Sequence, residues 1–240
     1  MTKFGAYLRL ALVATVFGSL SASGQPDSDT IDFRKISPEI APYGYVSRSH
    51  LWNSPIVPVC WENLSAGNLH ARMLVENAVE QTWEKYAKLS FTGWEKACSH
   101  ASPGVHLYIV DDANLPPDSL VGNRLDRVDR GVKLNTTFQN WNRDECVARA
   151  DDCTRIIAIH EFGHVLGLMH ESLRPDAPLA CKKSANVIRD ESDTGDGEAM
   201  QTAYDARSIM NYCNKIYGRQ ANLSPGDQQV AALIYPKPGI

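Results

Sequence analysis

The stretch HEFGHVLGLMHE, residues 160–171, restricts the fold of this chain most, because it places three of the seven histidines within eleven positions. The residues before it, DDCTRIIAI, begin an apolar face that continues through the stretch at helical spacing. Positions four apart lie on one face of a helix, so His160 and His164 are expected to point the same way. This is the spacing that two imidazoles need to share one metal ion.

The third histidine, His170, cannot reach that ion from the same helix, because it would lie roughly 240° around the axis from His164. Gly167 lies between them, and glycine enters the left-handed conformation that ends helices without steric cost. We therefore expect the helix to end near Gly167, and the chain to return so that His170 completes the ligand set.

Three imidazoles bind zinc at about 2.0–2.1 Å and leave a fourth position for a water, whose pKa falls to about 7. Glu161 adjoins His160, and a carboxylate there takes the water's proton and later passes it to a leaving amine. The stretch thus favours peptide hydrolysis by a zinc-bound water that a glutamate activates, with one catalytic Zn²⁺. The alternatives are a helix with ordinary histidines, or a closed structural zinc site, which would need a fourth protein ligand.

The pattern HExxHxxGxxH, followed by a methionine in SIMNY (residues 208–212), is similar to the signature of the metzincin zinc endopeptidases. The chain most resembles the astacin branch, because Glu171 directly follows the third histidine and HESLRPD resembles that branch's HExxRxD. SIMNY is also similar to the branch's SIMHY, with Asn211 in place of the histidine. The resemblance covers residues 50–240.

The resemblance implies an α+β fold. Its upper half would hold a mixed twisted sheet and two long helices including the zinc helix, and its lower half would be mostly irregular with a C-terminal helix. Met210 would form the hydrophobic base beneath the zinc, and Tyr212 would ligate the metal and stabilise the oxyanion. In the family, Glu171 bonds to the buried N-terminus of the processed enzyme. A protein or peptide substrate would lie extended along an edge strand, for which residues 131–138 are the candidate.

We therefore expect a secreted, monomeric zinc metalloendopeptidase. Two alternatives stay open: a catalytically silent, zinc-containing secreted binding protein, and a metzincin of another branch, serralysin or matrixin. Every catalytic position of the motif is intact, which speaks against the first, and Glu171 weighs against the second.

The N-terminus is typical of a signal peptide, residues 1–24, with Lys3 and Arg9 around the start of a short apolar run, LALVATVFGSL. The alternative is an N-terminal membrane anchor. Residues 25–48 are polar and predict a short leader or pro-segment before the catalytic domain, residues 49–240. Without residues 1–24 the chain has 22 basic and 28 acidic residues, a net charge of −6, which argues against a nucleic-acid partner. We expect no membrane partner.

All six cysteines follow the signal peptide, and an even number in an exported chain predicts disulfides, here with fifteen possible connectivities. This supports secretion to an extracellular or periplasmic compartment. Cys146 and Cys153 flank a short loop, which favours their pairing. Cys181 with Cys213 would tie the loop after His170 to SIMNY, leaving Cys60 with Cys98.

The remaining pattern predicts strands at residues 55–63, 104–110 and 131–138, and helices at 68–88 and 223–235. Ser224 is the expected cap of the last helix, with Pro225 at its first position. The acidic segment 189–198 is more typical of a solvated loop than of a calcium site. Four further histidines, His50, His70, His100 and His106, have no ligand spacing and are expected at the surface.

Overall fold

The computed structural model describes residues 44–141, 144–183, 198–199, 204–213, 217 and 220–237. They all belong to one compact unit of the chain. The expected signal peptide, most of the leader and nearly all of the acidic segment 189–198 lie outside the described residues. Within those residues, no helix has the length and apolar character that crossing a membrane requires.

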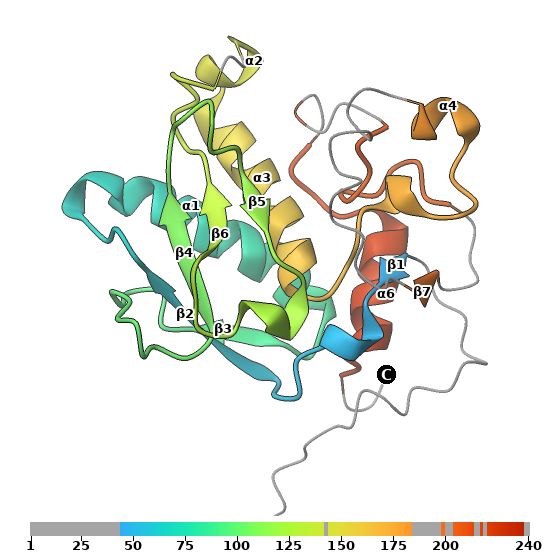
Figure 1. The fold of residues 1–240 in the computed structure, drawn as a ribbon, viewed down its shortest axis with the longest axis horizontal. Coiled ribbons are helices and arrows are strands. Elements are labelled where there is room, and N and C mark those ends of the chain that lie inside the picture. The colour runs from blue at the N-terminus through green and yellow to red at the C-terminus, as the bar shows by residue number, and fades with distance from the viewer. Residues whose placement is uncertain are drawn as a thin grey trace, which may run out of the picture. The chain divides into compact units, whose positions relative to one another are not determined.

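Five strands form the main sheet in the order β3-β2-β4-β6-β5 (Figure 1). The strands β2 (Ile56–Trp61), β3 (Ser90–Thr92), β4 (Val105–Ile109) and β6 (Val128–Leu134) are parallel, and β5 (Asp118–Ser119) runs antiparallel to β6. The three predicted strands are β2, β4 and β6. The predicted mixed sheet within an α+β fold is therefore confirmed.

The edge of this sheet differs from our expectation. The first half of residues 131–138 lies on β6, but β6 is covered by β5, which pairs Asp118 with Lys133 and Ser119 with Val132. Phe138 has a φ of 59°, so the chain has left the extended conformation by that point. A strand of two residues carries no alternating pattern, and this is why the sequence did not reveal β5 as the edge.

The two expected long helices are present and pack against each other: α1 (Leu69–Val79), extended by the π-helical turn η4 (Glu80–Glu84), and α3 (Ala150–Val165). The indole of Trp83 donates to the Ile159 carbonyl at 2.7 Å. The core face of α1 includes the buried Val75, whereas Met73 is 59% exposed. The contacts between α1, η4 and α3 fix the position of α3 in the fold.

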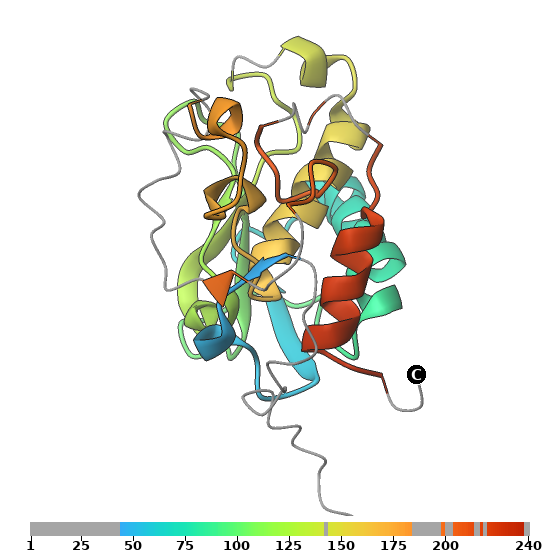
Figure 2. The same ribbon diagram turned by 90° about the vertical axis from the view of Figure 1, so that its right-hand side faces the viewer.

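The described residues between α3 and the last helix are mostly irregular, as expected. Figure 2 shows α3 between the strands and α6 (Pro225–Ile234). The start of α6 is as predicted, with Pro225 at its first turn and the Ser224 hydroxyl accepting from the Asp227 amide. The other elements are β1 (Tyr45–Val46), η2 (Arg48–His50), η3 (Ala66–Asn68), η5 (Gly122–Leu125), α2 (Asp144–Val147), η6 (Glu171–Leu173), α4 (Leu179–Lys182) and β7 (Glu198–Ala199), which pairs with β1.

Residues 44–48, which we assigned to the leader, are part of this fold. Val46 is completely buried, and the Ser47 amide donates to the Gly167 carbonyl at 2.9 Å. The Met169 amide in turn donates to the Tyr45 carbonyl at 2.7 Å. The folded chain therefore begins earlier than residue 49, because this segment forms backbone hydrogen bonds with the turn after α3.

The structure contains the three disulfides that we favoured among the fifteen connectivities, Cys60–Cys98, Cys146–Cys153 and Cys181–Cys213. The first joins β2 to the segment before β4, and the second joins α2 to α3. The third holds α4 to the segment after Met210. The irregular lower half is thus cross-linked close to the candidate site.

Candidate metal centre and active site

The three histidines of the motif converge on one point. The Nε2 atom of His170 lies 3.2 Å from Nε2 of His160 and 2.9 Å from Nε2 of His164. All three side chains are buried, and one nitrogen from each lies within 4.8 Å of the others. Around a tetrahedral zinc ion with bonds of about 2.0–2.1 Å, ligand nitrogens would be about 3.3 Å apart. The observed spacing fits such an ion.

Backbone carbonyls orient two of the rings. The Nδ1 atom of His160 lies 2.8 Å from the Ile209 carbonyl oxygen, and Nδ1 of His164 lies 2.8 Å from that of Leu168. A carbonyl oxygen only accepts, so each Nδ1 carries the proton and donates it. Each Nε2 is then left with a lone pair directed at the common point, which is the arrangement of metal-ligating histidines.

Burial keeps these imidazoles neutral. It lowers the pKa of His160 to about 3, with the neighbouring His164 adding to the effect. Burial also lowers the pKa of His170 well below its ordinary value, again with His164 contributing. A divalent cation takes neutral imidazole as its ligand. The donor set therefore fits a zinc ion in chemistry as well as in spacing.

The turn after α3 is a Schellman motif built on Gly167, which has a φ of 103°. The Gly167 amide donates to the His164 carbonyl at 2.8 Å, and the Leu168 amide donates to the Gly163 carbonyl at 3.0 Å. The expected end of the helix at Gly167 is confirmed. The same turn also brings the Leu168 carbonyl back to the His164 ring, so one motif stops the helix and orients a ligand.

Met210 lies under this arrangement and is 1% exposed. Its sulfur occupies the space that a side chain at Gly163 would need, so Gly163 allows the close approach of α3 and the methionine turn. The sequence did not mark Gly163, because it lies inside a helical pattern where a glycine has no local role.

Asp227, on α6, holds the methionine turn in place. Its carboxylate accepts from the Ser208 hydroxyl at 2.7 Å, from the Ile209 amide at 2.9 Å and from the Ser224 amide at 3.0 Å. Burial raises its pKa, and the three hydrogen bonds oppose that effect. The sequence placed Asp227 in the first turn of α6 but gave no sign of these partners.

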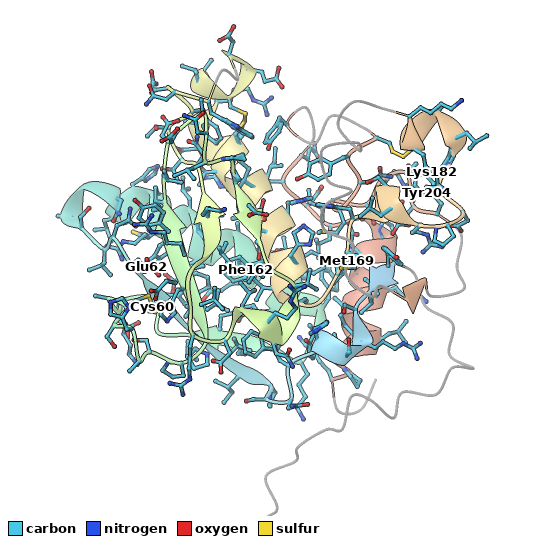
Figure 3. The ribbon with its side chains drawn as sticks, viewed as in Figure 1. Cys60, Glu62, Phe162, Met169, Lys182 and Tyr204 are labelled. Carbon is cyan, nitrogen blue, oxygen red and sulfur yellow. A yellow bond between two sulfur atoms is a disulfide. The ribbon has the colours of Figure 1, made fainter. Side chains whose placement is uncertain are left out.

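Tyr212 and Glu161 lie beside the histidines. The Tyr212 ring centroid is 4.9 Å from that of His160 and 4.6 Å from that of His170. Glu161 adjoins His160 on α3 and is 3% exposed. The following residue, Phe162, labelled in Figure 3, packs on Phe91 with ring centroids 4.9 Å apart and so anchors this turn of α3 to the sheet.

Glu171 connects the third histidine to the lower half. Its Oε1 accepts from the Asp205 amide at 2.8 Å and lies 3.4 Å from Nε of Arg174. Burial raises the pKa of Glu171 to about 7, against the effect of the Asp205 hydrogen bond and the Arg174 charge. Arg174 also donates to the Gly44 carbonyl at 3.1 Å. Glu171 therefore lies close to where the described chain begins.

The comparisons with known proteins agree with this site. The model of the Astacin peptidase family matches residues 139–234. Zinc metalloproteinase dpy-31 of Haemonchus contortus is 30% identical over 111 residues, which are 42% of this chain and 20% of that protein. Its counterpart in Brugia malayi is 30% identical over 118 residues, 44% of this chain and 19% of that protein. The chain thus spans about a fifth of the length of these curated relatives.

Solved structures share the fold. A structure of myroilysin matches with a TM-score of 0.55 and 20% identity, over 81% of this chain and 99% of that one. A second myroilysin structure matches with a TM-score of 0.52 and 19% identity, over 84% and 93% of the two chains.

The chain therefore shares its fold with the myroilysin structures, and its three-histidine centre has the donor set that could hold one metal ion. Residues 139–234, which include α3 and the methionine turn, are similar to the Astacin peptidase family.

Proposed function

We propose that this chain is a secreted, zinc-dependent endopeptidase that hydrolyses peptide bonds in proteins. The observation that carries the proposal is the convergence of the Nε2 atoms of His160, His164 and His170 on one point, with Glu161 next to the first of them. The astacin family match and the curated zinc metalloproteinases support the same activity.

The three histidines would hold the ion through Nε2. When bound, zinc supplies a Lewis acid that polarises a carbonyl and lowers the pKa of a water to about 7. The Glu161 carboxylate accepts a proton from the attacking water and passes it to the leaving amine. The Tyr212 hydroxyl donates a hydrogen bond to the oxygen that becomes negatively charged. Met210 and Gly167 act through the histidines, by packing beneath them and by placing His170.

The substrate would bind as an extended strand at β5. This strand ends the sheet and contacts α3, so a peptide paired with it would pass over the histidines. Backbone pairing at a sheet edge gives affinity with little demand on side chains. A short, polar edge strand such as Asp118–Ser119 suits a site that accepts varied sequences.

Secretion completes the proposal. Three disulfides persist in oxidising compartments, and the N-terminal pattern of residues 1–24 is that of an export signal. The chain would act as a monomer on extracellular or periplasmic proteins.

Casein cleavage by the purified chain, with and without a zinc chelator, tests the activity. We expect cleavage that the chelator abolishes and added zinc restores. The Glu161→Ala variant should keep its zinc and lose nearly all cleavage, because only the proton carrier is removed. Glu76→Ala, at a half-buried glutamate of α1, is the matched control and should cleave normally.

Two results would contradict the proposal. Full activity of Glu161→Ala would exclude the proton-transfer role. Intact, zinc-loaded protein with no cleavage of casein or of a peptide library would instead favour the catalytically silent zinc-binding protein.

A further inference from the structure

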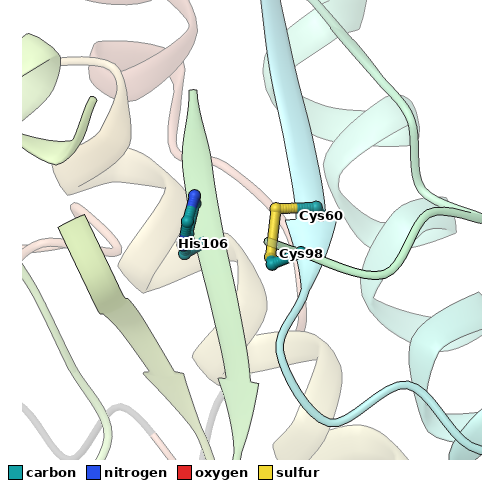
Figure 4. Close-up of side chains that lie close together, drawn as sticks. All are labelled: Cys60, Cys98 and His106. Carbon is teal, nitrogen blue, oxygen red and sulfur yellow. A yellow bond between two sulfur atoms is a disulfide. The ribbon is translucent and has the colours of Figure 1, made fainter. Parts of the chain in front are cut away.

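A second cluster of metal-ligating side chains lies on the sheet. The sequence predicts a surface position for His106, but the structure buries it completely on β4. Glu62 directly follows β2 and Asp129 lies on β6, so the three residues lie on, or directly after, the three central strands of the sheet. Figure 4 shows His106 beside Cys60 of the neighbouring strand, and Figure 3 shows Glu62 well away from Met169, which directly precedes His170.

An irregularity in β6 turns Asp129 toward His106. The register between β4 and β6 shifts between Val105 and Leu107, and Arg130 has a φ of 53°. Such bulges commonly redirect a side chain. Here they leave Oδ1 of Asp129 at 3.5 Å from Nδ1 of His106. The Arg130 amide also donates to Oε1 of Glu62 at 2.6 Å, which fixes that oxygen.

The hydrogen-bond partners of the His106 ring show which of its nitrogens carries a proton. Its Nε2 lies 2.9 Å from the Ser102 carbonyl oxygen, which only accepts, so Nε2 carries a proton. In the neutral ring, Nδ1 then presents a lone pair to Oε1 of Glu62 at 3.3 Å and to Oδ1 of Asp129 at 3.5 Å. The Arg130 guanidinium, with Nε at 3.8 Å from Oε2 of Glu62, lies beside one of the two carboxylates. A cation among Nδ1, Oε1 and Oδ1 would relieve the repulsion between the lone pair and both carboxylates.

The distances from Nδ1 of His106 are compatible with a metal ion shared among the three side chains. A charge-assisted N–H···O bond to a carboxylate is usually about 2.7–2.9 Å long. Both distances from Nδ1 of His106 are longer than that. Two ligand atoms that share an ion at about 2.1 Å are about 3.0–3.4 Å apart; the 3.3 Å distance to Glu62 lies within this range and the 3.5 Å distance to Asp129 lies just beyond it. The three ligand atoms lie within 4.8 Å of one another.

We propose that Glu62, His106 and Asp129 form a second metal site, for a divalent transition-metal ion of the zinc class. One imidazole and two carboxylates suit such an ion better than calcium, which prefers oxygen ligands alone. His100, with Nδ1 at 3.1 Å from Oδ2 of Asp129, orients the carboxylate from outside. The adjacent sulfurs of Cys60 and Cys98 form a disulfide and supply no thiolate. The ion would join three neighbouring strands.

Calorimetric titration of zinc into the metal-free full-length chain tests this site, in a Glu161→Ala background that prevents self-digestion. We expect two zinc equivalents per chain. Asp129→Asn and Glu62→Gln should each weaken one of the two binding steps at least about tenfold, because each removes a ligand. Asp129 is half exposed and Glu62 borders solvent, so both variants are expected to fold.

The matched control is His70→Asn. His70 lies 3.0 Å from Asp151 at the surface and makes a two-membered histidine–carboxylate pair of the same type. The His70→Asn variant should leave both zinc-binding steps unchanged. A parent chain that binds only one zinc would overturn the site. Two binding steps that neither Asp129→Asn nor Glu62→Gln alters would overturn it as well.

Discussion

The Asp227 carboxylate accepts a hydrogen bond from the Ser208 hydroxyl at 2.7 Å, across nineteen positions of the chain. The same carboxylate accepts from the Ile209 amide, and the Ile209 carbonyl accepts from Nδ1 of His160. A buried acid on the last helix is therefore linked to a proposed metal ligand through one residue of the methionine turn. Asp227 is a positioning residue for the metal centre.

Asp227→Asn should weaken these hydrogen bonds. One carboxylate oxygen is replaced by an NH2 group, which would face the groups that now donate to Asp227. We expect a loss of roughly 1–3 kcal/mol in the free energy of unfolding, measured with urea. Zinc affinity, measured by chelator competition, should fall about 10–100-fold, which is typical when a group that orients a metal ligand is mutated. Asp151→Asn, at an exposed position of α3, is the control. Unchanged zinc affinity in Asp227→Asn would contradict the positioning role.

Gly163→Ala should test the fit between α3 and the methionine turn. The added methyl group would collide with the Met210 sulfur and press on Trp83. Overpacking of this kind costs about 1–3 kcal/mol, so the melting temperature should fall. Gly67→Ala is the matched control, because a methyl group there meets nothing closer than 3.8 Å. Equal stability of the two variants would show that Met210 does not limit the space at Gly163.

Asp111 should make a pH-dependent contribution to stability. Its carboxylate accepts from Asn135, Thr137 and two backbone amides after β6. Partial burial raises its pKa, but these hydrogen bonds outweigh burial and leave the pKa below its ordinary value. A lowered pKa stabilises the folded state above the unfolded pKa of about 3.9, and the effect is lost as the pH falls through the folded pKa.

The stability difference between the parent and Asp111→Asn should therefore be largest near neutral pH and shrink below about pH 4. Urea unfolding at several pH values measures it. The neighbouring variant Asp112→Asn, which removes only contacts to Asn114, is the control. A difference that stays constant with pH would contradict the role of the Asp111 charge.

Tyr212→Phe should keep zinc and lose catalysis. The ring packs beside His160 and His170, so removal of its hydroxyl leaves the packing intact. Loss of one oxyanion donor usually lowers kcat about 10²–10³-fold. Tyr86→Phe is the control, at a tyrosine packed against the core near α1. Normal kcat in Tyr212→Phe would remove the tyrosine from the mechanism.

The sequence predicted the parts of the fold that depend on local chemistry. The end of the helix at Gly167 could be predicted because the glycine, the preceding helix and His170 are neighbours in the sequence. The cap of α6 could be placed for the same reason, since Ser224 and Asp227 are three positions apart.

What the sequence could not predict depends on distant partners. The edge strand β5 has two residues and is defined only by its pairing with β6. The sequence around His106 predicts a surface residue, because its partners Glu62 and Asp129 approach it only when the neighbouring strands pair. Asp227 likewise forms its hydrogen bonds with Ser208 and Ile209 only when α6 packs against the methionine turn.

X-ray absorption at the zinc edge tests the central claim most directly. The sample is the chain with Asp129→Asn and Glu62→Gln, loaded with one zinc, so that the histidine centre alone is observed. Three imidazole nitrogens at about 2.0–2.1 Å and a light fourth ligand are the predicted result. A spectrum with fewer than three imidazoles, or with sulfur at about 2.3 Å, would contradict the shared ion at His160, His164 and His170.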